Sequence, residues 1–572
     1  MTIRNLLLTV AAAILMPSAG SASGNRQIPI PADHAWRSGT AYRADAARYD
    51  IWEKDVVTVE DARYKHLGYE APLRTAFFLK GLKDVTLDFG GATLVLHGKF
   101  QPFLLDCCTN VCIRNVKVLH SRSPFTEGDV VEVMENGFKM RIDRKTFPYE
   151  VKDGDIVFMG DTWQNRDSPS SSFLQFFDGA TRCGVELMLA AVGRHAKVDE
   201  SRPWAKDTLR LEVEEEDDLL VLKGMKPCRK FKAIRPGWRA VMAHEERSLS
   251  NCMMVECRDM SLVNYRVMNG FGMGIFPFRC HNVLLDGVKF THDRESPGFA
   301  SNCADAIHAF ACSGDFVIRD SVVEGMIDDA LNIHSNFYTV DSAEGDRIVA
   351  DTRLEPFSST PLFLPGDRIR VYRGLTLDAL DDYRIVAVRP IGKHLVEFTL
   401  DHAVPPDAKG SAIENLVTQC RIRISNCRFG KSNTHLRFQT RGEILVENCV
   451  SEQPFMLTGD MNYWFESSPC EKVTFRNVRF LTDKGRLRVQ PKFLDTESSP
   501  YYHGDILFVG CTFEAEDVGS CEYARSLTFR NCGNSLGKAM RLKAVNCGEV
   551  VAPGIEVERR TLPHRTALGV TY

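Results

Sequence analysis

One short pattern recurs along this chain and constrains its fold more than any other feature. It reads apolar, any, apolar, any, and then a residue that tolerates a left-handed backbone. That fifth residue is always Asn, Asp or Gly, the types that adopt positive φ with least strain. Each copy therefore predicts a half-buried strand that ends in a sharp bend. The nine copies end at Asn115, Asn264, Gly287, Asp320, Asn426, Asn448, Asn477, Gly510 and Asn531.

The spacing of the copies predicts a solenoid. The copies that start at Ile422 and Ile444 lie 22 residues apart, and those that start at Met260 and Val283 lie 23 apart. A repeat of this length with one kind of bend suits one circuit of a three-sided coil. We therefore expect an all-β fold, a right-handed parallel β-helix. An immunoglobulin-type sandwich does not explain the repeated bend, and the Leu spacing of leucine-rich repeats is absent.

Two segments lack the repeat and predict inserted domains. Residues 121–249 and 336–417 carry short alternating strands with Gly-Asp turns, such as Gly128-Asp-Val-Val-Glu-Val and Pro365-Gly-Asp-Arg-Ile-Arg-Val. Such strands are typical of small antiparallel barrels, so we expect two β-barrel-like domains at the rim of any site between them.

The rest of the chain divides around these insertions. We expect an N-terminal cap and first coils over 23–120, with a helix from Asp45 to Glu53. Coils that carry a cluster of Asp residues follow over 250–335. C-terminal coils and a tail fill 418–572, with a less regular segment beyond Asn546 along the outside.

The first 22 residues predict a signal peptide. Arg4 precedes a short apolar run from Leu6 to Met16, and small residues follow up to an expected cleavage near Ala22. The run is too short to span a bilayer, and no later stretch approaches the roughly 20 apolar residues of a membrane helix. We therefore expect a periplasmic or secreted protein without a membrane span.

Charge and cysteine content narrow the functional classes. The net charge is −4 and no Lys- or Arg-rich run occurs, so nucleic acid is not an expected partner. Cys residues that follow the bends predict an inward stack of free thiols. The sequence does not decide whether Cys107 and Cys108, or Cys252 and Cys257, form disulfides. The Cys spacing does not fit zinc, and we expect no metal or cofactor. The stacked thiols are Cys427, Cys449, Cys511 and Cys532.

Three Asp residues are the candidate catalytic groups. Asp305 and Asp329 are 24 positions apart, about one coil, so they should lie on neighbouring strands roughly 4.8 Å apart, with Asp328 beside them. Carboxylates this close repel one another, a cost typical of sites kept for reactivity. The alternative is that these Asp residues are polar residues at the bends of the coil and have no catalytic function. A group of carboxylic acids suits glycoside hydrolysis, in which one protonates the leaving oxygen.

Further residues near these Asp residues are candidates for sugar binding. An indole can stack on a sugar ring. The alternatives to sugar binding are a purely structural role for the histidines, a solvated sheet face for the Arg and Gln residues, and a place in the hydrophobic core for the Trp. The candidates are His308, Asn332 and His334 after the Asp motifs, Arg437 and Gln439 on one face with His435, and Trp464 and Glu466 outside the repeat.

The motifs Ala304-Asp-Ala-Ile-His and Ile327-Asp-Asp-Ala-Leu-Asn-Ile-His, with the coil pattern and the two insertions, resemble glycoside hydrolase family 110. Its members are bacterial exo-acting α-1,3-galactosidases. The resemblance implies inversion, with Asp328 as general acid and Asp305 and Asp329 as the residues that hold and deprotonate water. It also implies no metal requirement, and terminal α-1,3-linked galactose as substrate, as in blood group B or linear α-Gal glycans.

Two other functions stay open. A polygalacturonase-like or other β-helix enzyme that degrades polysaccharides would also cluster Asp residues, but the Gly-His-Gly and Arg-Ile-Lys elements of polygalacturonases are absent. A non-catalytic glycan-binding solenoid is the other. The expected partner is a terminal α-galactosyl oligosaccharide or glycan. Nothing in the sequence sets the oligomeric state, and a dimer is one option.

Overall fold

The structure is a computed structural model in which strands dominate, so the all-β prediction is confirmed. Within the described residues the remaining regular elements are short 3-10 helices. The described ranges are 25–28, 36–61, 72–165, 172–196, 208–244, 249–292, 298–352, 362–392, 394–430, 435–462, 464–481, 486–495 and 501–566. The predicted signal peptide, 1–22, lies outside them.

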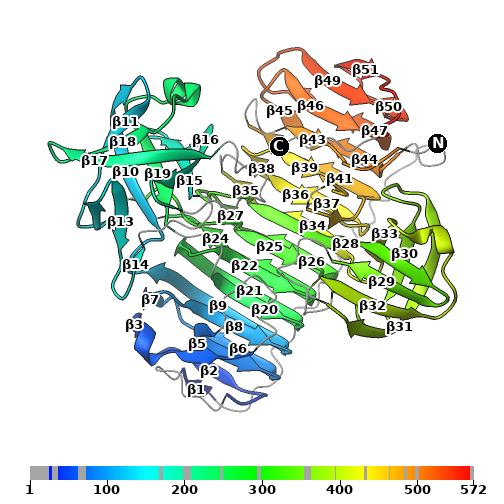
Figure 1. Cartoon of the computed structure of the whole chain (residues 1–572), viewed down its shortest axis with the longest axis horizontal. Helices are drawn as coiled ribbons and strands as arrows, with labels where there is room; N and C mark the ends of the chain where they lie inside the picture. Colours follow the sequence, from blue (N-terminus) through cyan, green and yellow to red (C-terminus); the bar gives the residue numbers. More distant parts are fainter. Residues whose placement is uncertain are drawn as a thin grey trace, which may run out of the picture.

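Parallel ladders of strands run through the molecule and stack from the blue end to the red end of Figure 1. Each strand pairs in parallel with the strand one repeat later. A first ladder includes β34 (Cys420–Ser425), β37 (Ile444–Glu447), β41 (Lys472–Arg476), β44 (His503–Val509) and β47 (Ala524–Arg530). A second includes β35 (Arg428–Phe429), β38 (Val450–Ser451) and β42 (Arg479–Phe480). A third includes β36 (Leu436–Phe438), β39 (Phe455–Leu457) and β43 (Leu487–Val489).

The bends between the first two ladders are the left-handed residues that the repeat predicts. All nine fifth-position residues have positive φ, between 50° at Asn264 and 66° at Gly287. Asn side chains also join successive coils: Asn477 Nδ2 donates to Asn448 Oδ1 at 3.2 Å. The bends therefore combine a low-strain backbone with a hydrogen bond between neighbouring coils.

Inward-facing side chains form one continuous core inside the stacked strands. Phe475, Phe508 and Phe529 stack in register, with ring centroids 4.7 and 4.6 Å apart. All eighteen cysteines are free thiols, including the pairs that the sequence left open. Cys427 N–H donates to Cys449 Sγ at 3.4 Å, so the predicted thiol stack is confirmed at this pair.

A closed barrel lies in the first insertion. It forms a lobe on one side of the stack in Figure 1. Its pairs are antiparallel apart from β16–β17, which run parallel. Its strands are β10 (Phe125–Met134), β11 (Gly137–Arg141), β15 (Ser172–Asp178), β16 (Gly184–Gly193), β17 (Leu209–Glu216), β18 (Leu219–Gly224) and β19 (Trp238–Ala243).

The second insertion closes an antiparallel ring on the opposite side of the stack (Figure 1). Its first strand, β28 (Leu331–Glu344), starts in the third ladder and runs on into the ring. The insertion is thus joined to the coil that carries the candidate site by an unbroken strand. The ring continues through β29 (Arg347–Asp351), β32 (Leu395–Leu400), β31 (Ala379–Pro390), β30 (Arg368–Tyr372) and β33 (Ala412–Asn415).

Two local predictions are wrong. The helix expected from Asp45 to Glu53 is instead strand β3 (Arg48–Trp52), which pairs in parallel with β7 (Thr93–His97) before a 3-10 turn over Glu53–Asp55. Ile51 faces inward, so tertiary pairing outweighs local helix preference. The tail is also regular, since β50 (Glu549–Val551) and β51 (Ile555–Arg560) extend two ladders in parallel.

Among the described residues, we find no helix with the length and apolar character needed to cross a membrane.

Candidate active site

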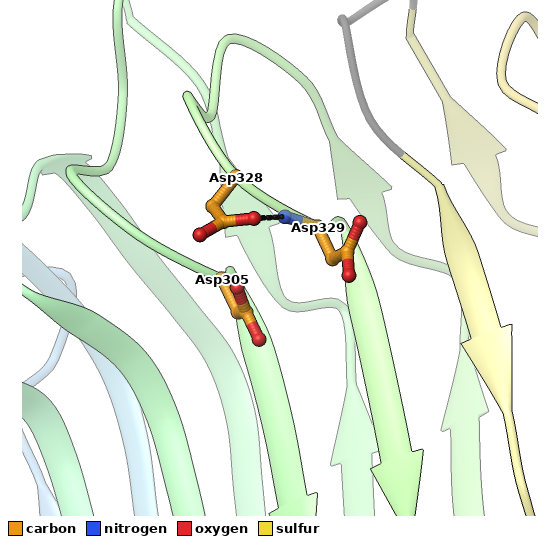
Figure 2. A group of neighbouring side chains, drawn as sticks. All are labelled: Asp305, Asp328 and Asp329. Atoms are coloured by element: carbon orange, nitrogen blue, oxygen red, sulfur yellow. Dashed lines mark hydrogen bonds between the residues drawn. The ribbon is translucent and has the colours of Figure 1, made fainter. Parts of the chain in front are cut away.

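Three carboxylates meet at the start of two neighbouring strands. Asp305 precedes β25 (Ile307–Phe310) and Asp329 precedes β28, and these strands pair in parallel with Ile307 opposite Leu331. Asp305 and Asp329 therefore occupy equivalent positions one coil apart, with Asp328 on the loop beside them (Figure 2). One oxygen from each carboxylate lies within 4.8 Å of the other two.

Burial distinguishes the three groups. Asp305 and Asp329 are 2% and 6% exposed, whereas Asp328 is half-buried. The N–H of Asp329 donates to Asp328 Oδ1 at 3.0 Å, which directs that carboxyl back along its own loop (Figure 2). Asp328 is thus the most accessible acid of the group.

Asp329 is held by the later coil that contains His435 and Arg437. The N–H of His435 donates to Asp329 Oδ1 at 3.0 Å, and Arg437 Nη1 lies 3.5 Å from Oδ2. Burial raises the pKa of Asp329, but the hydrogen bond from His435 and the charge of Arg437 outweigh it and hold the pKa below its usual value. Asp329 is therefore a carboxylate at neutral pH.

Asp305 is held by a chain of two histidines. His308 Nδ1 lies 2.6 Å from Asp305 Oδ2, and His308 Nε2 lies 2.8 Å from His334 Nε2. His334 Nδ1 in turn donates to the carbonyl of Ser335 at 2.8 Å. Burial lowers the pKa of His334 to about 4, so its ring is neutral at pH 7.

Glu466 adds a fourth acid to the same network, since Arg437 contacts both Asp329 and Glu466. It lies on β40 (Glu466–Ser467), which pairs antiparallel with β28, and its Oε2 accepts from Gln439 Nε2 at 2.8 Å. Arg437 Nη1 is 3.6 Å away, and Asn332 Nδ2 is 3.4 Å from Oε1. Burial raises the pKa of Glu466, but the charge of Arg437, joined by that of His334 once this ring is protonated at low pH, outweighs burial and holds the pKa at about 2.

The structure brings most of the predicted binding residues into this one network. His308, Asn332 and Arg437 occupy equivalent positions on successive strands. Gln439 is buried. Burial lowers the pKa of Arg437, but the negative charges of Glu466 and Asp329 raise it by more, so the guanidinium stays charged. This face of the sheet is therefore not the solvated surface considered as an alternative.

Trp464 is half-buried, and its backbone N–H donates to Asp460 Oδ2 at 3.3 Å. Sugar stacking on its indole stays a prediction.

Sequence reasoning missed the residues by which the first barrel braces the Asp loops. The carboxylate of Glu127 on β10 accepts from the N–H groups of Phe299 and Ala300 at 2.8 and 3.0 Å. Gln175 on β15 donates to the carbonyl of Ile327, directly before Asp328. These contacts join segments far apart in the sequence, so no local motif predicts them.

The second barrel is anchored to the coils by a buried ion pair that was also missed. Arg441 donates to both oxygens of Glu414 at 2.8 Å and to the hydroxyl of Tyr372 at 2.7 Å. Glu414 lies on β33 and Tyr372 on β30, so this contact ties the ring to the coil after the Asp cluster.

The arrangement brings two buried carboxyl groups and a more exposed one together, with one oxygen from each within 4.8 Å of the others. Such a group can hold a water molecule and protonate a leaving oxygen. The oxygens of Asp305, Asp328 and Asp329 are also hard donors of the kind that could hold Mg²⁺ or Ca²⁺.

Known proteins with similar sequences are named as galactosidases. Residues 126–183 match the family described as GLAA-B beta-barrel domain I. The chain is 24% identical over 488 residues to alpha-1,3-galactosidase B of Bacteroides thetaiotaomicron, covering 82% of this chain and 76% of that protein. It is 25% identical over 459 residues to alpha-1,3-galactosidase B of Akkermansia muciniphila, covering 77% of this chain but only 55% of the relative.

A solved structure titled "Glycoside hydrolase" covers 91% of this chain and 89% of its own chain, at 8% identity and a TM-score of 0.21. A TM-score this low does not establish a shared fold.

Proposed function

We propose that this chain is a glycoside hydrolase, an exo-acting α-1,3-galactosidase that removes terminal α-1,3-linked galactose from blood group B or linear α-Gal glycans. The observation that carries the proposal is the meeting of Asp305, Asp328 and Asp329 on two paired strands, with one oxygen from each within 4.8 Å. Similarity to proteins named alpha-1,3-galactosidase over most of the chain supports the linkage and the sugar.

The proposed mechanism assigns one acid and a shared base. Asp328, the most accessible carboxyl, gives its proton to the glycosidic oxygen as the bond to the anomeric carbon breaks. Asp305 and Asp329 hold a water molecule between them, and one of them takes its proton as the water oxygen attacks. The charge of Arg437 keeps Asp329 ionised for this role.

Inversion is the finer part of the proposal, and the spacing provides a real test of it. Acid and base are about 6.5–9.5 Å apart in most inverting glycosidases and about 5–5.5 Å in retaining ones. The nearest oxygens here lie within 4.8 Å, which favours retention by that rule. We still favour inversion because hydrogen bonds hold both carboxylates in place, Asp329 by His435 and Arg437 and Asp305 by His308. Each can still accept a hydrogen bond from water, but neither is free to move onto the anomeric carbon.

Following the released anomer by NMR tests both points. The purified protein is incubated with α-1,3-galactobiose and, separately, with blood group B trisaccharide. β-Galactose as the first product supports the proposal, and α-galactose would establish retention. An α-1,4-linked galactobiose is the control for linkage.

Other outcomes would select the other functions. Cleavage of polygalacturonate would favour the polysaccharide-degrading alternative. Glycan binding without hydrolysis would favour the non-catalytic solenoid.

The proposal extends to architecture and location. We propose that the parallel ladders are the faces of a right-handed parallel β-helix that carries two inserted barrels over 121–249 and 336–417. We further propose that the protein acts outside the cytoplasm, in the periplasm or after secretion, where terminal galactosyl glycans are the expected partners. The apolar run from Leu6 to Met16 supports this location.

A further inference from the structure

The hydrogen bonds that run from Ser335 to Asp305 have a fixed direction. The carbonyl oxygen of Ser335 can only accept, so the proton between it and His334 lies on Nδ1. His334 is buried and its ring is neutral. Because a neutral imidazole carries one proton, His334 Nε2 holds a lone pair and must accept.

That direction determines the protonation of His308. Its Nε2 lies 2.8 Å from the accepting Nε2 of His334, so His308 Nε2 carries a proton and donates. The other nitrogen, Nδ1, lies 2.6 Å from Asp305 Oδ2. Whenever Asp305 is a carboxylate, Nδ1 must donate as well, and His308 then carries protons on both nitrogens as an imidazolium.

The surroundings of the two rings suit one positive charge and one neutral ring. Asp305 faces His308 from the loop before β25, and Glu466 on β40 lies 3.9 Å from His334 Nε2. Arg437 on β36 and the carboxyl groups of Asp328 and Asp329, with His435 beside Asp329, are further charged or titratable groups around this pair. The rings of Phe276 and Phe310 cover His308 at 5.5 and 6.4 Å between centroids.

We propose that His308 and His334 are positioning residues that keep Asp305 ionised as a catalytic base. Ser335 orients His334, His334 orients His308, and His308 presents a cationic N–H to Asp305. The two ionised carboxylates of the site then each have a cation beside them, His308 at Asp305 and Arg437 at Asp329. This inference rests on the proposed hydrolase function.

The histidines do not move a proton in the reaction. The proton from water goes to Asp305 as the water oxygen bonds to the anomeric carbon, and the proton of Asp328 goes to the leaving oxygen. Asp305 then returns a proton to solvent, and Asp328 regains one. His308 keeps both of its protons throughout, so its effect is on the proton affinity and orientation of Asp305.

A matched pair of variants separates this role from packing. Asn places its amide near the position of imidazole Nδ1, so His308→Asn can still donate to Asp305. Gln reaches the position of Nε2 instead, so His308→Gln keeps the contact with His334 and loses the one with Asp305. In the pH profile of kcat/KM, we expect the acidic limb to shift to higher pH by about one unit or more in His308→Gln and by less in His308→Asn.

The reciprocal pair tests His334. His334→Gln retains an acceptor for His308 Nε2, whereas His334→Asn retains only the donor to Ser335. We expect His334→Gln to keep the acidic limb closer to wild type than His334→Asn does. Thermal unfolding of all four variants measures the change in stability. Equal losses of activity in both members of a pair, with no shift of the limb, would overturn the proposal.

¹⁵N NMR of histidine-labelled wild-type protein tests the chain without any substrate. We expect His334 to be protonated only at Nδ1 and His308 at both nitrogens at pH 7, with signals assigned by their loss in the variants. A proton on Nε2 of His334, or a single proton on His308, would refute the inference. Absence of galactosidase activity in wild type would instead refute the proposed function.

Discussion

Glu466 offers the sharpest test of how charge is balanced in the site. Burial raises its pKa, but the charge of Arg437, joined by that of His334 once this ring is protonated at low pH, outweighs burial and holds the pKa at about 2, roughly 2.5 units below the ordinary 4.5. Each unit corresponds to about 1.4 kcal/mol, so the ionised carboxylate contributes about 3 kcal/mol to stability at neutral pH. Replacing it by Gln should remove that contribution.

The pH dependence follows from the lowered pKa. A carboxylate with a depressed folded-state pKa stabilises the protein fully above about pH 4.5 and progressively less as pH falls toward 2. The free energy of unfolding of wild type should therefore exceed that of Glu466→Gln by about 3 kcal/mol at pH 7. We expect this difference to shrink by about 2 kcal/mol at pH 3.

Urea unfolding of both proteins at pH 7 and pH 3, followed by tryptophan fluorescence, measures these differences. Glu447→Gln is the control, since Glu447 pairs at 3.3 Å with Arg476 on the surface and should change stability by less than about 1 kcal/mol. A Glu466→Gln protein as stable as wild type at pH 7 would refute the reasoning. So would a difference that does not change with pH.

Four further predictions follow from the same structure. Asp328→Asn should lower kcat by about 10² to 10⁴ without a change in melting temperature, and wild-type turnover would rule out its role as general acid. Arg441→Met should cost about 3–5 kcal/mol in urea unfolding because it leaves Glu414 charged and buried, and Arg441→Met with Glu414→Leu should recover much of that loss. Asn448→Val should destabilise the protein by about 1–3 kcal/mol, while Asn448→Gly should be milder because φ is 55° there. Treatment with EDTA should leave hydrolysis unchanged, and a loss restored by Mg²⁺ or Ca²⁺ would give the three carboxylates a metal-binding role.

The strand-and-bend repeat could be predicted from the sequence because it depends on residues that are close together in the chain. Asn, Asp and Gly adopt the left-handed backbone conformation with least strain. An alternating strand that ends in one of them, as at Asn426 and Asn448, therefore predicts a sharp bend at that residue. In a coil with a nearly constant repeat, separation along the chain becomes adjacency between strands. The sequence alone therefore predicts that Asp305 and Asp329, one repeat apart, lie side by side, as the structure shows.

The residues missed, and the helix wrongly expected, have a different physical origin. Glu127 and Gln175 reach the Asp loops from a separate barrel, and that docking leaves no periodic trace in the sequence. The segment from Arg48 to Trp52 is polar enough to suggest a helix, yet pairing with β7 makes it a strand.

The amino-acid sequence alone determined the strand-and-bend repeat, the inward thiols and the coil spacing of the acids, because each depends on residues close together or one repeat apart. Only the tertiary structure decided the charge balance. The antiparallel pairing of β40 with β28 places Glu466 beside Arg437, and the Ser335 carbonyl sets the direction of the histidine chain. Electrostatic interactions in a buried site depend on distances of a few ångströms between remote segments, and folding alone sets those distances.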